Sequence, residues 1–477
     1  MLRGLERSLA RRRVRRREEH FSAKEPDPSL ARGTDRLGGF EHLVVLMMEN
    51  HSFDNYLGML GRGDGFALDA RGRPSETNPA ADGEAVPLVR RPVRQVPVVP
   101  TQSWHASHIQ YDGGSNDGFV RSVEETLPGC DARMPMTYWT EEDLPFYYGL
   151  ARTFPLADRW FSSCLGPTFP NRRFLVAGTA HGLLDDLPFN LFDHPKSGTI
   201  LDLMTAHGVS WANYHHISRF RVNWRRFSRA RGVSALRRLG FLVAAVVRPL
   251  RTSLESKVQA TADVYPLGFL GLGNHLRPID AFWRGVADGR LPSVSIVDPD
   301  FERCSEENPQ DIQAGEGFAA KVVEAVMAGP KWSTTLLIWV YDEHGGYFDH
   351  VAPPAAPTPD GVPGHNPARR PVVGWLLRRF EYGRQIDMLD EGPTSYDRLG
   401  FRVPAVVISP YAKPDYVSST PFDHTSILKL IELKWNLPSL TARDAAAVAP
   451  LDCLDFAASP TFLSPPRIPA PARPWKG

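Results

Sequence analysis

The sequence predicts an α/β protein whose mostly parallel sheet is covered by helices on both faces. Short apolar runs rich in β-branched residues are typical of buried parallel strands. The predicted strands are residues 42–48, 294–297, 335–340 and 403–408, and two of the helical patterns between and after them are residues 318–327 and 425–435. Because strands and helices alternate along the chain, the pattern favours a three-layer αβα sandwich.

Polar residues directly follow three of the predicted strands, as Glu49-Asn50, Asp298-Pro299-Asp300 and Asp342-Glu343. Open parallel sheets bind their ligands at the carboxyl ends of the strands, so we expect these clusters to converge. Two adjacent carboxylates repel each other unless a cation lies between them, and a bound divalent cation removes that cost. The oxygen-rich set favours Ca²⁺, Mg²⁺ or Mn²⁺, and carboxylates also bind Zn²⁺.

The segment 166–173 reads Gly-Pro-Thr-Phe-Pro-Asn-Arg-Arg and predicts a rigid turn that presents the hydroxyl of Thr168. A metal-bound threonine hydroxyl loses its proton more readily and becomes a competent nucleophile. Several histidines also lie near the polar turns, and any one of them alone is most simply an ordinary polar or core residue. Their repeated position beside acids and glycines favours acid–base chemistry or phosphate contacts. They are His51, His105, His108, His344, His350 and His424.

Composition sets only broad bounds on the function. The 477 residues are 42% hydrophobic, with Lys+Arg 55 against Asp+Glu 54 and a formal net charge of +1. The chain can therefore bury a large core, and a global role in binding polyanions is not implied. The four cysteines form no CxxC pair, which makes a zinc finger or a disulfide scaffold a weak interpretation. Bridges between Cys164 and Cys304 or between Cys130 and Cys453 both stay open.

We divide the chain into a basic arm at residues 1–39, expected to be disordered, a catalytic domain at 40–455 and a Pro-rich tail at 456–477. Paired arginines near residues 11–17 suggest an export leader, but no apolar segment follows them. We therefore expect no signal peptide, and a location in the cytoplasm or peripherally at the inner face of the membrane. Residues 217–262 and 355–398 have the character of insertions within the catalytic domain.

The insertion at 217–262 holds ten arginines between Arg219 and Arg251, around an apolar run at 239–247. That run is shorter than the roughly 20 apolar residues that span a bilayer. The pattern fits peripheral contact with an anionic membrane surface, and fits equally a helical lid with solvated arginines. Nucleic acid is not expected as a partner, because no aromatic-rich recognition module accompanies the arginines.

Three longer segments, residues 49–54, 166–172 and 342–351, resemble the bacterial phosphoesterase family. That family holds the non-specific phospholipases C and a related acid phosphatase, and it belongs to the alkaline-phosphatase-like superfamily. With shorter similar stretches, the resemblance covers roughly residues 40–445 in the order of the family. It implies an alkaline-phosphatase-like fold and a hydrolase that acts on a phospholipid or another phosphate ester.

The resemblance also implies a metal centre and a nucleophile. One divalent metal ion would be bound by Glu49, Asn50, Thr168, Asp342 and Glu343. Thr168 matches the nucleophile of the family, which is serine or threonine, and would form a covalent phospho-enzyme that water later releases. The metal would position the hydroxyl and neutralise charge on the transferring group.

Other residues carried over from the resemblance would contact the substrate. His350 would contact the phosphoryl group or act as acid on the leaving alkoxide, and His108 matches a catalytic histidine of the family. Arg172, Gln102 and Asn308 would bind the substrate. Gln102 and Asn308 stand where the family often has histidine, and they can hydrogen-bond a phosphate but cannot shuttle a proton.

The resulting hypothesis is a phospholipase C that cleaves glycerophospholipids to diacylglycerol and a phosphorylated head group. One alternative is an acid-phosphatase-type phosphomonoesterase that uses the same metal and Thr168. Another is a non-catalytic phospholipid-binding relative, which Gln102 and Asn308 favour. The retained Thr168 and Asp342-Glu343 argue against a pure binder, because binding needs no activated hydroxyl.

Overall fold

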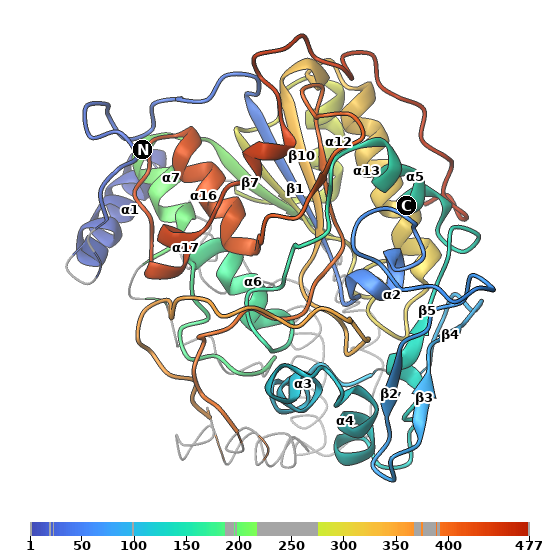
Figure 1. Cartoon of the computed structure of the whole chain (residues 1–477). Helices are drawn as coiled ribbons and strands as arrows, with labels where there is room; N and C mark the ends of the chain where they lie inside the picture. Colours follow the sequence, from blue (N-terminus) through green and yellow to red (C-terminus); the bar gives the residue numbers. More distant parts are fainter. Residues whose placement is uncertain are drawn as a thin grey trace, which may run out of the picture.

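The computed structural model describes residues 2–18, 21, 23–97, 100–186, 195, 198–216, 275–366, 374, 388 and 392–475. Its centre is an eight-stranded sheet with helices on both faces (Figure 1). The strand order is β12-β6-β11-β10-β1-β9-β7-β8. The bounds are β1 His42–Met48, β6 Leu156–Ala157, β7 Trp211–His215, β8 Leu276–Pro278, β9 Val294–Val297, β10 Thr335–Tyr341, β11 Ala405–Ile408 and β12 Val417–Ser418.

The five strands from β10 to β8 run parallel, in agreement with the predicted sheet. The prediction was wrong for residues 403–408, because β11 begins at Ala405 and runs antiparallel to β10. A strand buried on both faces has the same apolar composition in either direction, so its residues do not reveal its orientation. The mixed α/β sheet nevertheless keeps the carboxyl ends of β1, β9 and β10 at one edge.

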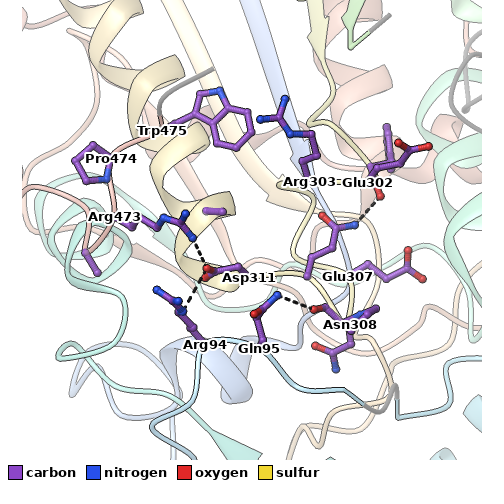
Figure 2. Close-up of a pocket in the computed structure, with 15 residues that line it drawn as sticks. Arg94, Gln95, Glu302, Arg303, Glu307, Asn308, Asp311, Arg473, Pro474 and Trp475 are labelled. Atoms are coloured by element: carbon purple, nitrogen blue, oxygen red, sulfur yellow. Dashed lines mark hydrogen bonds and ion pairs between the residues drawn. The ribbon is translucent and has the colours of Figure 1, made fainter. Parts of the chain in front are cut away.

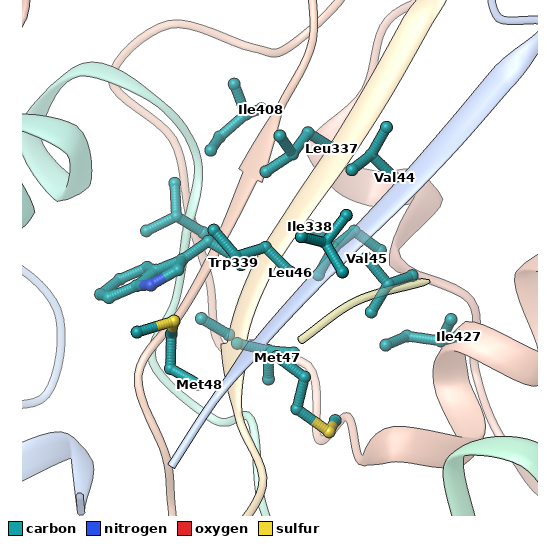
Figure 3. Packing of buried hydrophobic residues seen from close by; sticks show 14 of the residues in the cluster. Val44, Val45, Leu46, Met47, Met48, Leu337, Ile338, Trp339, Ile408 and Ile427 are labelled. Carbon is teal, nitrogen blue, oxygen red and sulfur yellow. The ribbon is translucent and has the colours of Figure 1, made fainter. Parts of the chain in front are cut away.

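The centre of the core lies around β1 and β10, whose residues are all buried. Figure 3 shows their side chains packed against those of β11 and of the helix at residues 424–434. The two strands pair in register from His42 opposite Thr335 to Met48 opposite Tyr341. The residues that follow, Glu49 and Asp342, therefore leave the sheet at the same level.

Helices form the two outer layers, as the sequence predicted (Figure 1). One layer contains α1 Leu2–Glu18, α6 Thr168–Ala177, α7 Ile200–His207, α16 His424–Lys434 and α17 Ala442–Ala446, and the other contains α5 Pro145–Thr153, α12 Ile279–Ala287 and α13 Ile312–Ala328. The predicted helices at 318–327 and 425–435 correspond to α13 and α16. Near the carboxyl end of the sheet lie α2 Phe53–Leu57, α3 Trp104–Tyr111, α4 Phe119–Thr126 and the short strands β2 Thr77–Pro79, β3 Ala85–Pro87, β4 Val89–Arg90 and β5 Thr137–Tyr138.

The N-terminal residues differ from the disordered arm that the sequence predicted, because they form α1, packed against α7. Ala10 and Val14 enter the core, and Arg13 pairs with the buried Asp202 at 2.9 Å. The guanidinium of Arg17 is buried and donates to the carbonyl of Ser439. Arg13 and Arg17, which were expected to be solvated, therefore contact buried groups and hold the helix in place. Ala10 and Val14 of the same helix face the core.

Two other sequence expectations concern the insertions and the possible disulfides. The insertion at 217–262 and most of 355–398 lie outside the described residues, so the predicted membrane contact stays a prediction. None of the helices in the described ranges is long and apolar enough to span a membrane. All four cysteines are free thiols, so neither candidate disulfide forms.

Candidate active site

Arg172 joins the three strand ends that the sequence predicted to converge. It lies on α6, fully buried, and its Nε donates to Asp342 Oδ2 at 2.8 Å after β10. Its Nη1 donates to Asp298 Oδ1 at 2.9 Å after β9, and its Nη2 lies 3.5 Å from Glu49 Oε1 after β1. A single guanidinium therefore holds carboxylates from three parallel strands at one point of the sheet edge. This arrangement brings the predicted clusters together, with Arg172 between them.

Thr168 is the first residue of α6 and is buried at the N-terminus of that helix. The preceding loop is fixed by Asn171, whose Oδ1 accepts from the backbone N–H of Ser163 and of Cys164 at 2.8 and 3.0 Å. The hydroxyl of Thr168 donates to Asn50 Oδ1 at 3.3 Å. Free N–H groups and the helix dipole make such an N-terminus favourable for an anion such as a phosphoryl group.

The turn after β10 is in direct contact with the turn after β1. Gly345 has φ +66°, and a Cβ there would lie only 2.0 Å from the carbonyl oxygen of Asn50. Only glycine allows this approach. Asn50 itself adopts φ 67°, a left-handed conformation that costs a non-glycine residue energy and is concentrated at functional sites. Glu343 completes the turn, because its Oε2 accepts from the N–H of Gly345 at 2.6 Å.

Several oxygen and nitrogen atoms at this point are buried without a hydrogen-bond partner among the described residues. They include Glu49 Oε2, Glu343 Oε1 and Asn50 Nδ2. Burial, followed by the negative charge of Asp342, raises the pKa of Glu343 well above its usual value. The pKa of Glu49 is also raised, chiefly by burial, although the charge of Arg172 opposes the shift. Uncompensated buried carboxylates are costly, and a cation bound between them would remove the cost.

The donor set fits a hard cation in its chemistry, since it offers carboxylate, amide and hydroxyl oxygens. Asp342 already uses Oδ2 for Arg172 and Oδ1 for the N–H groups of Asn50 and Glu343. Within the described ranges, no three histidine, cysteine, aspartate or glutamate side chains are arranged to hold a metal by themselves. The candidate shell therefore depends on Asn50 and Thr168 as well as on the carboxylates.

Two histidines of the predicted cluster support the turn at 342–344. His424 Nε2 donates to the carbonyl of Asp342 at 2.7 Å. His344 lies between Glu343 Oε2 at 3.2 Å and Gln110 Oε1 at 2.7 Å. Burial lowers the pKa of His344 to about 3, so its ring is neutral at neutral pH. These contacts orient the backbone and the carboxylate of the candidate metal shell.

The predicted substrate residues Gln102 and Asn308 belong to loops around residues 346–347. Asn308 Nδ2 donates to the hydroxyl of Tyr347 at 2.5 Å. A Cβ on Gly346 would lie 2.6 Å from the carbonyl of Thr101, so the loop that carries Gln102 touches the same turn. This geometry groups both residues beside the segment that follows Glu343, although no contact with a substrate tests their predicted role.

His108 lies one side chain away from the Gly166–Thr168 turn. Its Nδ1 donates to the carbonyl of Trp104 at 2.7 Å, and its ring centroid lies 4.7 Å from that of Trp104. Trp104 in turn covers Gly166, where a Cβ would lie 2.9 Å from the indole. Burial lowers the pKa of His108, which favours its neutral form.

His350 lies in a second ionic cluster, which we call the Asp54 cluster: Asp54, Asp64, Asp349, His350 and Arg402. His350 Nδ1 lies 2.6 Å from Asp54 Oδ2, and Nε2 lies 3.3 Å from Asp64 Oδ1. Arg402 donates to Asp54 and Asp349 at 2.9 and 2.8 Å. Burial opposes protonation of His350, but the hydrogen bond and charge of Asp54 outweigh it and raise the pKa to about 9. His350 is therefore a cation at neutral pH.

Sequence reasoning did not assign Asp298, Asp186 or Glu307 to the site. Asp298 was recognised only as a polar strand end, and its pairing with Arg172 needs the fold. Asp186 accepts from the N–H of Phe169 at 2.7 Å and thereby fixes the residue next to Thr168. Burial and then the charge of Asp342 raise the pKa of Glu307 to about 7. In the sequence, only its position directly before Asn308 could have indicated that Glu307 belongs to the site.

With this geometry established, comparison with known proteins identifies the family. A model of the Phosphoesterase family matches residues 40–438. The chain belongs to the Phosphoesterase family. As a member, it is a hydrolase of phosphoric esters. The match covers β1 through α16, and therefore includes every strand end and helix that forms the candidate site.

Relatives of this phosphoesterase include proteins from bacteria and a plant. Phospholipase C B of Mycobacterium tuberculosis is 31% identical, over 90% of this chain and 80% of the relative. Non-specific phospholipase C1 of Arabidopsis thaliana is 29% identical, over 92% and 76%. Non-hemolytic phospholipase C of Pseudomonas aeruginosa is 28% identical, over 91% of this chain and 59% of the relative.

A solved structure of a protein in the alkaline phosphatase superfamily, from Vibrio parahaemolyticus, also aligns with this phosphoesterase. The alignment covers 93% of this chain and 80% of that one, with 10% identity and a TM-score of 0.37. A likeness of that size carries no detail of the site. The α/β class itself is evident from the sheet and its two helical layers.

Proposed function

We propose that this phosphoesterase is a metal-dependent phospholipase C that uses Thr168 as its nucleophile. One observation carries the proposal: the Thr168 hydroxyl lies at the N-terminus of α6, 3.3 Å from Asn50 Oδ1, at the strand ends where Glu49 and Glu343 each keep one buried oxygen without a partner among the described residues. That combination offers a nucleophile, a binding site for an anion and a site for a cation at one point. The names of the relatives support a phospholipid as the substrate.

The proposed reaction begins when Thr168 Oγ1 attacks the phosphorus of the diester. The bond between phosphorus and the diacylglycerol oxygen breaks, and the phosphorylated head group stays on Thr168 until water displaces it. A divalent cation at Glu49, Asn50, Thr168, Asp342 and Glu343 would lower the pKa of the hydroxyl, so that its proton passes to solvent, and would neutralise charge on the phosphoryl group. Arg172 holds three strand ends in place, so we assign it a positioning role.

The leaving alkoxide of diacylglycerol must gain a proton in the first step. His350 suits this role, because Asp54 keeps it protonated at neutral pH. Gln102 and Asn308 can donate hydrogen bonds to phosphate oxygens without exchanging protons. His108, held neutral by burial, can accept a proton from the attacking water in the second step.

The test is hydrolysis of p-nitrophenyl phosphorylcholine by the wild type, Thr168→Ala and Thr168→Ser, with metal content assayed in each. We expect metal-dependent activity that falls by at least about 10³-fold in Thr168→Ala, as for other essential nucleophiles, and that partly returns in Thr168→Ser. Thr153→Ala is a matched control, because that hydroxyl donates to the carbonyl of Gly149 on the distant helix α5.

Each result separates the candidate functions. Activity on the diester with little on p-nitrophenyl phosphate supports a phospholipase C, and the reverse preference supports a phosphomonoesterase. A fully active Thr168→Ala variant would exclude the proposed nucleophile. A bound metal without activity on either compound would instead favour a non-catalytic phospholipid-binding protein.

A further inference from the structure

Arginines on the surface of this protein are commonly balanced by carboxylates. At a cavity of about 970 Å³ near the last described residues, Figure 2 shows Asp311 between Arg94 and Arg473, which lie 3.5 and 2.6 Å from its Oδ2. Arg133 likewise pairs with Glu84 at 3.0 Å. Such pairs leave little net charge for a charged partner to recognise.

The outward face of α1 differs, because its arginines lack this balance. Every exposed side chain from Arg7 to Arg16 is an arginine, except Ser8. Within the described chain, none of these exposed arginines pairs with a carboxylate. Since the whole protein has a formal net charge of only +1, positive charge is concentrated on this face. The exposed arginines are Arg7, Arg11, Arg12, Arg15 and Arg16.

The acidic residues of α1 do not neutralise this face. Glu6 is buried, and its Oε1 lies 3.0 Å from Nε2 of His275. Glu18, at the end of the helix, pairs with Arg32 at 2.5 Å. Both carboxylates of the helix are therefore engaged with other parts of the protein.

The exposed arginines also repel one another along the helix. Arg7, Arg11 and Arg15 follow each other at intervals of four residues, and Arg12 and Arg16 form a second pair at the same interval. Side chains four residues apart lie next to each other on a helix, and like charges at that spacing destabilise it. Alternating charges would make a more stable helix, so this pattern indicates a function that needs positive charge.

The basic end of α1 lies at the same end of the sheet as the candidate active site. Because α7 leads directly into the first residues of β7, the start of α7 lies towards the carboxyl end of the sheet. α1 runs along α7 in the opposite direction. Its Arg11 donates to the carbonyl of Ala206 at 3.5 Å, and Arg17 approaches Gly198, just before α7. The last arginines of α1 therefore lie towards the end of the sheet that carries Thr168 (Figure 1).

The chemistry of this face fits an anionic membrane surface. Clustered arginines on a helix are attracted to anionic lipid head groups, and helices that lie in the membrane interface also present apolar side chains. Leu5 is 50% exposed and precedes Arg12 by about two helical turns, so both lie on the outward face. A flat membrane can contact the whole row of arginines at once, because the helix is convex.

We propose that the outward face of α1 binds membranes that contain anionic phospholipid. The choice of a lipid surface as partner rests on the proposed phospholipase C function, because the substrate of that reaction is a membrane lipid. Arg12, Arg15 and Arg16 would contact the phosphates of the head groups. Binding would hold the carboxyl end of the sheet close to the membrane, and it is separate from the contact predicted for residues 217–262.

The test is co-sedimentation of the full chain with vesicles of phosphatidylcholine alone, or of equal parts of phosphatidylcholine and phosphatidylglycerol. The lipid composition is checked after each run. We expect binding to the anionic vesicles only, weakened by added salt. The triple variant Arg12→Gln, Arg15→Gln and Arg16→Gln should raise the Kd by about ten- to a hundredfold. The triple lysine variant at the same positions keeps the charge and should bind within about threefold of the wild type.

A matched control removes the same charge from other parts of the surface. Arg71, Arg284 and Arg467 are exposed and lie outside α1, so their triple glutamine variant should bind the anionic vesicles almost as tightly as the wild type. Glutamine is a good helix former, and an unchanged melting temperature shows that each variant is folded.

The outcomes separate this surface from its alternatives. An unchanged Kd in the α1 glutamine variant, or an equal loss in the matched control, would overturn the proposal. Binding to duplex DNA without binding to vesicles would overturn it in favour of a nucleic-acid partner. Hydrolysis of the soluble ester p-nitrophenyl phosphorylcholine is measured in parallel. Vesicle binding that depends on the arginines, without hydrolysis of this ester or of a phospholipid, would support the membrane surface and contradict the phospholipase reaction.

Discussion

Two groups of buried carboxyl side chains lie near each other in this protein and differ in how their oxygens are satisfied. Glu306 accepts hydrogen bonds from three tyrosine hydroxyls, with Tyr147 on Oε1 at 2.6 Å and Tyr56 and Tyr341 on Oε2 at 2.9 and 2.5 Å. At the strand ends, Glu49 Oε2 and Glu343 Oε1 have no partner among the described residues. Both groups are fully buried.

The difference separates a structural role from a functional one. A buried polar group that protein donors satisfy contributes to the stability of the fold, whereas an unsatisfied one lowers it and persists only where function requires it. Glu306 also accepts its hydrogen bonds from residues on three different elements, which fixes the loop that carries Glu307 and Asn308. We therefore expect opposite responses of stability when the two groups are changed.

The largest change should come from Glu343→Gln in the unsatisfied group. Loss of one charged metal ligand should reduce activity by about 4 kcal/mol, or about 10³-fold. In metal-depleted protein the same variant should unfold at an equal or higher denaturant concentration than the wild type, because a repelled buried charge is gone. Added divalent metal should raise the melting temperature of the wild type and not that of the variant, as thermal unfolding would measure.

A clear destabilisation of metal-free Glu343→Gln would contradict this interpretation of the site. It would mean that protein contacts, rather than a bound cation, satisfy the carboxylate. Glu84→Gln serves as control for the substitution itself, since Glu84 forms a surface pair with Arg133 far from the strand ends.

The satisfied group should respond in the opposite way. Glu306→Leu leaves three buried tyrosine hydroxyls without their acceptor and should lower the free energy of unfolding by about 3 kcal/mol or more. Glu306→Gln keeps an acceptor oxygen and the shape of the side chain, so its loss should be about 1 kcal/mol. Urea denaturation measures both. Equal losses in the two variants would show that packing, rather than hydrogen bonding, is what Glu306 contributes.

The same contrast explains how much of the molecule the sequence could predict. The strands 42–48 and 294–297 were predicted with their observed bounds, because continuous β-branched runs are a local signal. The orientation of β11 and the packing of α1 were not, since both depend on contacts between distant segments. The buried guanidinium of Arg17, for example, donates to the carbonyl of Ser439, a residue 422 positions away along the chain.

At the candidate site, the sequence pointed to polar residues that follow strand ends and to the hydroxyl of Thr168 in the turn at 166–173. Glu49, Asn50, Thr168, Asp342 and Glu343 do lie together around Arg172 or within its contacts. Their metal binding and the role of Thr168 stay predictions. The tyrosines around Glu306 come from three separate elements, and no spacing in the sequence relates them. Such networks of single side chains leave no local pattern.

The Asp54 cluster contains a third kind of buried carboxylate, because Asp54 pairs with His350, whose charge depends on pH. Asp54→Asn should lower the pKa of His350 from about 9 towards its ordinary value near 6.5. Activity that needs protonated His350 should then fall by up to about thirtyfold at pH 8, with little change at pH 6. The pH–rate profile of the two proteins measures the shift.

The pair of His350 and Asp54 also predicts how the stability of the fold changes with pH. Because folding raises the pKa of His350, the stabilisation is fully present below about pH 6.5 and is lost as the pH rises through about 9. Asp64→Asn is the control, since Asp64 is half-exposed and lies 3.3 Å from Nε2. An unchanged alkaline limb in Asp54→Asn would exclude His350 as the acid.

The smallest predicted effect is a pH dependence of the free energy of unfolding that Glu306 causes. Burial raises the pKa of Glu306 to about 8, although the three tyrosine hydroxyls oppose the shift. The folded protein thus binds one proton more than the unfolded chain between about pH 4.5 and pH 8, and wild-type stability should fall over that range as the pH rises. The slope for one proton is at most about 1.4 kcal/mol per pH unit.

Glu306→Gln has no such proton to release, so the variant should lack this slope, and the slope should appear in full in the difference between the two proteins. Denaturation at pH 5, 6, 7 and 8 would show the wild type losing its advantage over the variant step by step, and no further loss above about pH 8. A difference that stays constant with pH would mean that the tyrosines hold Glu306 as a carboxylate. The loop before Glu307 and Asn308 would then be held by charged hydrogen bonds, and its position would be insensitive to pH over the range in which the enzyme is assayed.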